Sequence, residues 1–174
     1  LCSAAGRPVS FLISDFRFRD SGLRPVMSRP MSPDRRQALL REVRAVYDEL
    51  ASRPVERDCT GRAECCRFKL TGRTPFLTRG EALVAAQAVR ASGKKRLPPA
   101  PDGACPLLEG ARCRIYEGRP FGCRTHFCRA AGGPYARGEV RDLIQRLDDI
   151  DREFGGSGGV NLPGALQWAL EQRG

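Results

Sequence analysis

The sequence is poor in aromatic residues, has a single histidine and contains no long apolar segment. Phenylalanine, tryptophan and tyrosine make up 7% of its 174 residues, and no apolar run approaches the roughly twenty residues of a membrane helix. Surfaces that bind nucleic acid interleave aromatic with basic side chains, so nucleic acid is not expected as a partner. No glycine-rich nucleotide loop follows a clear strand, and no Ser-His-Asp set is present around His126. These absences argue against several enzyme classes and leave the question of an enzyme open.

The first thirty residues lack both a secretory signal and a sustained periodicity. Their one short apolar stretch, residues 9–13, is interrupted by Asp15 and Arg17, so secretion is not expected and a cytoplasmic protein is predicted. Residues 1–30 are predicted to be a disordered or misassigned extension, with Met31 or Met27 as the true start. In the cytoplasm disulfides are rare, so the thiols of this chain need another explanation.

Cysteine is what the sequence has in unusual abundance. Seven of its eight cysteines fall into two groups, and the second group also contains the histidine. Adjacent cysteines such as Cys65 and Cys66 cannot form an unstrained disulfide with each other. A structural metal contributes roughly 10–16 kcal/mol of apparent folding free energy, whereas a disulfide contributes about 2–4 kcal/mol. The predicted metal ligands are therefore Cys59, Cys65, Cys66, Cys105, Cys113, Cys123, Cys128 and His126.

The formal net charge of +10 counts no thiolates. Four thiolates around one divalent ion carry about −2, which lowers the total. Basic residues flank both cysteine groups and are expected to lower the pKa of the thiols. A solvated basic surface is the alternative explanation, and it stays open. The flanking residues are Arg57, Arg62, Arg67, Lys69, Arg112, Arg114, Arg119, Arg124 and Arg129.

Capping signals and apolar periodicity predict about four helices. Ser32 and Pro33 begin the first, which ends at Pro54, and a capping box of Thr78 and Glu81 begins a second that closes near residue 93. Apolar stripes predict helices over residues 140–154 and 163–172. We expect a helix-rich α+β fold, a small single domain over residues 31–174 around an irregular cysteine cluster, with one short β-hairpin.

Three local features carry further expectations. Residues 67–70 are predicted to form a short strand, and the glycine-rich residues 155–159 a flexible link. The hairpin is predicted to turn through a three-residue loop at 108–110, which pairs Cys105 directly with Cys113 and gives Gly110 a positive φ. Directly opposed residues have β-carbons about 4.5–5.5 Å apart, so both sulfurs would reach one metal centre.

The cysteine pattern resembles the cysteine cluster proteins of YkgJ type. The resemblance rests on Cys59-x5-Cys65-Cys66 and on the strings CPLL, CRIYEGRP and CR that begin at positions 105, 113 and 123, within a core motif at residues 55–130. The family signature is CxxCxxCC, and its domain is described as zinc- or iron-chelating. Arg62 stands where that signature has its second cysteine, so the resemblance implies one ligand fewer or recruitment of Cys128 or His126.

The spacing leaves the metal and the function class open. Seven cysteines with His126 could hold two zinc ions, and four cysteines could hold one [4Fe–4S] cluster, which irregular spacing slightly favours. The first function class is a metal-binding protein with a structural or redox-active site. The resemblance also implies a metal-dependent enzyme, since the family is related to a flagellin lysine methylating enzyme. A zinc-stabilised nucleic-acid-binding module is the third class, which the basic charge favours.

Overall fold

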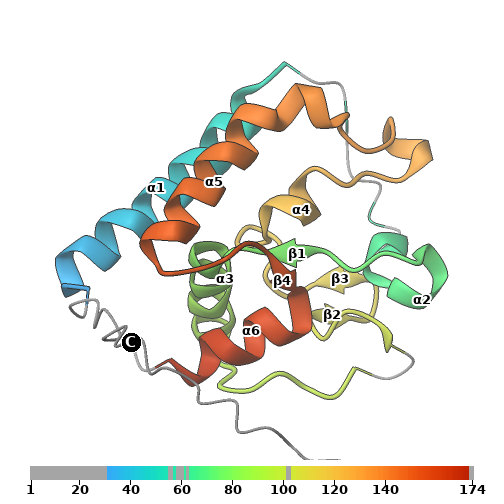
Figure 1. Cartoon of the computed structure of the whole chain (residues 1–174). Helices are drawn as coiled ribbons and strands as arrows, with labels where there is room; N and C mark the ends of the chain where they lie inside the picture. The colour runs from blue at the N-terminus through green and yellow to red at the C-terminus, as the bar shows by residue number, and fades with distance from the viewer. Residues whose placement is uncertain (1–30, 55–56, 58–60, 62, 101–102, 173–174) are drawn as a thin grey trace, which may run out of the picture. The chain divides into compact units, whose positions relative to one another are not determined.

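A computed structural model describes residues 31–172 except 55–56, 58–60, 62 and 101–102. The described chain is helix-rich α+β, as predicted, with four longer helices, two four-residue helices and two pairs of two-residue strands (Figure 1). In chain order the helices and strands are α1 (Pro33–Ser52), α2 (Phe68–Thr71), β1 (Phe76–Leu77), α3 (Arg79–Ala91), β2 (Leu108–Glu109), β3 (Arg112–Cys113), α4 (Phe121–Arg124), α5 (Arg141–Glu153), β4 (Val160–Asn161) and α6 (Leu162–Glu171).

The two predicted helix caps are confirmed. The Ser32 side chain accepts a hydrogen bond from the amide of Arg35 at 3.2 Å, ahead of Pro33 at the first helical position of α1. Thr78 and Glu81 form the reciprocal capping box of α3. At α6 the cap is Asn161, whose side chain accepts from the amide of Gly164 at 3.0 Å.

One hydrophobic core joins the four longer helices. Helices α1 and α5 lie side by side, and α3 contacts α1, α5 and α6 (Figure 1). The predicted stripes point inward, since Leu39, Val43, Leu143 and Leu166 are fully buried. Burial of these faces stabilises the helices, because isolated segments of ten to twenty residues are marginal in water. None of the described helices has both the length and the apolar character that crossing a membrane requires.

The β-hairpin has a different register from the predicted one. Leu108 pairs with Cys113 and Glu109 with Arg112, so the loop contains two residues, Gly110 and Ala111. Gly110 does have a positive φ, +60°, as a two-residue turn with glycine at its first position requires. The prediction that Cys105 pairs directly with Cys113 is therefore wrong. Cys105 lies outside the ladder, in a turn closed by a hydrogen bond from the amide of Leu108 to its carbonyl at 3.0 Å.

Two other local predictions are also wrong. Residues 67–70 belong mostly to the short helix α2, which ends at Gly72 in the left-handed conformation (φ +64°). Residues 155–159 are not a free link, because the buried Asp151 binds them. Its carbonyl accepts from the amide of Gly156 at 2.8 Å and its carboxylate from that of Gly158 at 2.9 Å. The other carboxylate oxygen accepts from the amide of Arg79 at 2.7 Å, at the start of α3.

Candidate metal centre

Three short segments bring five cysteines together. Cys65 and Cys66 lie on the 3-10 helix Glu64–Cys66, Cys105 and Cys113 lie before and within the hairpin, and Cys123 lies on α4. A backbone hydrogen bond joins the two sequence groups directly, since the amide of Cys105 donates to the carbonyl of Cys66 at 2.7 Å. The residue before the 3-10 helix, Ala63, has a φ of +54°. A left-handed backbone at this residue therefore sets the direction in which the helix with Cys65 and Cys66 begins.

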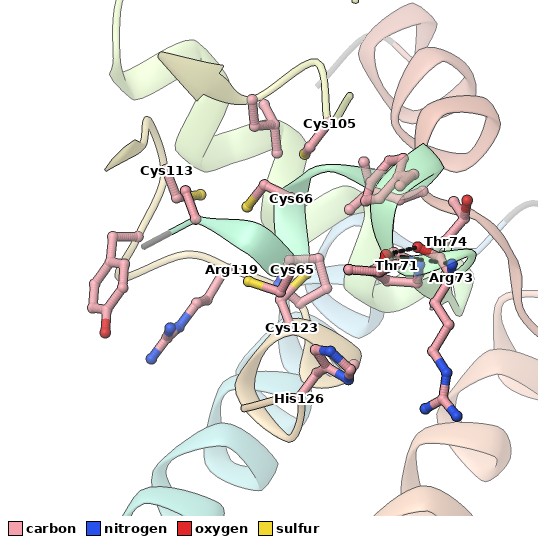
Figure 2. A pocket seen from close by; sticks show the side chains of 18 of the residues that line it. Cys65, Cys66, Thr71, Arg73, Thr74, Cys105, Cys113, Arg119, Cys123 and His126 are labelled. Carbon is pink, nitrogen blue, oxygen red and sulfur yellow. Dashed lines mark hydrogen bonds between the residues drawn. The ribbon is translucent and has the colours of Figure 1, made fainter. Parts of the chain in front are cut away.

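All five cysteines line one cavity of about 510 Å³ (Figure 2). None of the five forms a disulfide. The predicted ligand His126 also lines this cavity, whereas Cys128 is absent from its wall. Cys59 lies outside the described residues. The structure thus brings six of the eight predicted ligands to one cavity. The lining thiols are Cys65, Cys66, Cys105, Cys113 and Cys123.

The thiols raise one another's pKa. The pKa of Cys65 is well above its ordinary value because its thiol shares a hydrogen bond with Cys66 and is partly buried. A hydrogen bond with Cys105 raises the pKa of Cys66 to about 12. Burial raises the pKa of Cys123, followed by the charges that Cys66 and Cys113 would carry, and burial raises that of Cys113. Without a cation these groups stay protonated at neutral pH.

One flanking cation lowers the pKa of two of these thiols as expected, although the pKa of all four is raised on balance. Arg119 does act in that direction on Cys65 and Cys113, but hydrogen bonding and burial outweigh it. Its guanidinium lies 3.9 Å from the ring centre of Tyr116. The buried Nε of Arg119 has no hydrogen-bond partner within the described residues, so this donor is available to a group in the cavity.

Helix α4, which carries Cys123, is held at both ends. At its start the amide of Phe121 donates to the buried carboxylate of Glu81 at 2.9 Å. At its end Arg124 donates from Nε to the carbonyl of Arg119 at 2.8 Å. Its terminal nitrogen Nη2 donates to the carbonyl of Glu117. The same guanidinium lies 4.6 Å from the ring centre of Tyr47 on α1. These contacts fix the position of Cys123 relative to the helical core.

Sequence reasoning missed the second contact of Glu81. The capping box predicts only its bond to Thr78, and the partner Phe121 lies 40 residues further along the chain. The one available signal is that α3 begins, in the sequence, between the two cysteine groups. A side chain at the start of α3 could therefore reach either cysteine group. Nothing in the local pattern selects Phe121, because that contact depends on how the intervening chain closes.

His126 is held in the form that binds metals. Burial lowers the pKa of the imidazole, and the nearby charge of Arg73 lowers it further. The neutral ring is therefore favoured at neutral pH, and a neutral nitrogen is what coordinates a metal.

The donor set of the cavity suits a soft metal. Thiolates select zinc and iron–sulfur clusters, and the positive charge of either would replace the protons that the crowded thiols retain. In the described part of the chain, no three cysteine, histidine, aspartate or glutamate side chains are arranged to hold an ion. The chemistry of the donors fits a metal, and the metal and its ligand set stay predictions.

No family model matches the chain, and no curated protein or solved structure resembles it significantly. The resemblance to the YkgJ-type cluster proteins therefore stays a prediction from the cysteine pattern.

Proposed function

We propose that this chain is a metal-binding protein in which cysteine thiolates hold an iron–sulfur cluster or Zn²⁺, with a structural or redox-active role. The observation that carries the proposal is the convergence of five thiols, from three segments, on one cavity. Thiols that occurred only as small apolar residues would be spread through the core rather than gathered on one wall.

The proposed ligands are the cysteines of that wall. Four thiolates suffice for one [4Fe–4S] cluster or one zinc ion, and the wall offers five. The fifth thiol, together with the irregular spacing of the cysteines, slightly favours the iron–sulfur cluster over zinc. His126 lines the same cavity and is the proposed nitrogen ligand if one is used. When bound, the metal would supply a positive charge that stabilises the thiolates and, if it is an iron–sulfur cluster, a site for one-electron transfer.

We further propose that the protein works in a reducing compartment, the cytoplasm, as a member of the YkgJ-type cluster family. Cys65, Cys66, Cys105, Cys113 and Cys123 form no disulfide, as expected of ligands that must remain available as thiolates.

Metal analysis with a visible absorption spectrum, on protein purified without oxygen, tests the proposal. We expect iron with inorganic sulfide, or zinc, at close to stoichiometric amounts. Replacing Cys65 and Cys66 together by serine should lower the metal content at least about tenfold, because two adjacent ligands are lost. The matched control is Cys2→Ser, outside both cysteine groups, which should keep its metal. Unchanged metal content in the double variant, with a normal circular dichroism spectrum, would contradict the proposal.

A further inference from the structure

We infer that the cavity binds a small organic carboxylate with an apolar body beside the metal centre, with Arg73 as the anchor of its carboxylate. The inference rests on the proposed function, because it assigns the metal to the thiol wall and the ligand to the remaining space.

The cavity is larger than the metal centre requires. Its volume, about 510 Å³, lies within the range of roughly 300–1,000 Å³ that is usual for small-molecule sites. A zinc–sulfur bond is about 2.3 Å long, so a metal held by thiolates stays against the wall that carries them. The far side of the cavity is thus left for a second occupant.

The charge of the lining selects an anion. Three arginines, Arg73, Arg112 and Arg119, line the cavity, and among the residues that the structure describes no aspartate or glutamate does. Within the described residues none of the three forms an ion pair with a carboxylate. Elsewhere in the described chain six arginines form such ion pairs. They are Arg35, Arg53, Arg57, Arg114, Arg146 and Arg152.

Arg119 and Arg73 serve different sides of the cavity. In Figure 2 they lie on opposite sides of the cysteines. Arg119 acts electrostatically on Cys65 and Cys113, so its charge offsets that of the thiolates. Arg73 acts instead on His126, and its backbone is fixed by a hydrogen bond from its amide to Oγ1 of Thr71 at 3.4 Å. Arg73 therefore supplies a guanidinium on the side of the cavity away from Arg119, and guanidinium–carboxylate pairs are commonly bidentate.

The wall beside Arg73 is apolar, which sets the class of ligand. Phe68, Pro75 and Leu162 line the cavity there. The amide of Leu162 donates to the carbonyl of Pro75 at 2.8 Å, so the start of α6 and the segment before β1 form one fixed surface. A ligand with a flat apolar body and one carboxylate matches this surface and Arg73, whereas a bare inorganic anion would leave the apolar wall uncovered.

Isothermal titration of the metal-loaded full chain with 2-naphthoate and 2-naphthamide tests the inference, because the two probes share one ring system and differ in charge. We expect naphthoate to bind at least about tenfold more tightly than naphthamide. Arg73→Gln should weaken naphthoate binding about tenfold and leave naphthamide binding unchanged. Arg41→Gln, an exposed arginine on α1 that does not line the cavity, is the matched control and should behave as wild type.

Equal affinities for the two probes, or wild-type naphthoate binding by Arg73→Gln, would overturn the inference. Inorganic phosphate that competes as well as naphthoate would also overturn it, because the apolar body would then contribute nothing. Elemental analysis of the same samples separates the two proposals. Full metal content without naphthoate binding defeats only the carboxylate site, whereas naphthoate binding by folded protein that never holds metal defeats the proposed function and supports the site.

Discussion

Glu81 links the helical core to the candidate metal centre through a single side chain. Its exposure is 3%, and its two oxygens accept hydrogen bonds from three segments of the chain. Oε2 accepts from the amide and the hydroxyl of Thr78, both at 3.0 Å, and Oε1 from the amide of Phe121 at 2.9 Å and the hydroxyl of Tyr47 at 3.4 Å. A carboxylate can accept all four bonds because it carries only acceptor sites. The start of α3, α1 and the start of α4 are thereby joined at one group.

Replacing Glu81 by glutamine should destabilise the protein by about 1–3 kcal/mol. An amide keeps one acceptor oxygen, but its NH₂ group would face a donor, at either Thr78 or Phe121, and leave it unsatisfied. Urea denaturation followed by circular dichroism measures the change. Glu171→Gln, at an exposed position of α6, is the matched control and should stay within about 0.5 kcal/mol of wild type. Equal stability of the two variants would show that Glu81 does not anchor α4.

The loop between the hairpin and α4 packs directly on α3, and a glycine makes that possible. A β-carbon built on Gly118 would lie 2.5 Å from the β-carbon of Ala88, closer than real contacts allow. Neither atom lies at the end of a flexible side chain, so the loop itself would have to move away from the helix. This loop also carries Arg119 and precedes Cys123, which makes the packing of an element part of the geometry of the site.

Gly118→Ala should therefore cost about 1–3 kcal/mol of stability through overpacking. Ala88→Gly removes the opposing methyl group and alone should cost about 1 kcal/mol, the usual price of glycine within a helix. The double variant should lose less stability than the two single variants lose together, because the clash between the two β-carbons is gone. Denaturation of the four proteins of this cycle gives the coupling. Strictly additive losses would contradict the close approach of loop and helix.

At the scale of the whole molecule, a helical core and the irregular segments that carry the cysteines differ in how much regular structure they contain. The core is built mainly from the four longer helices, and Leu107, Ile115 and Phe121 of the cysteine-bearing segments are buried in it. The cysteine segments contain only very short helices and strands, and of their five cavity-lining cysteines only Cys105 is buried. The residues of this core begin at Met31, which packs against it as a partly buried side chain.

A chain that starts at Met31 should keep the metal content and melting temperature of the full chain. The prediction follows because the described core and cavity are built from residues 31–172. Calorimetry and elemental analysis measure both quantities, and we expect a melting temperature within about 2 °C of the full chain, since 1 kcal/mol corresponds to roughly 2–8 °C. As a control, a chain that starts at Arg41 lacks the fully buried Leu39 and should unfold. A large loss on removal of residues 1–30 alone would show that they belong to the core.

The sequence by itself determined the parts of this protein that depend on neighbours within one or two helical turns. Ser32 and the pair Thr78 and Glu81 mark helix starts because a cap needs only a side chain and the amides two or three residues on. The apolar stripe from Leu143 to Ile150 marks a buried face because helical spacing places it there. The two cysteine groups could likewise be recognised as one candidate site from composition and spacing.

Only the tertiary structure decided which cysteines share a cavity. Cys105 reaches Cys66 through a backbone hydrogen bond between segments far apart in the sequence, and Cys128 stays off the wall although it is only five residues from Cys123. The hairpin register could not be predicted from the sequence either, since a turn at Gly110 and Ala111 changes the partner of every strand residue. Contacts of this kind depend on how the whole chain closes around the core, and local pattern carries no information about that closure.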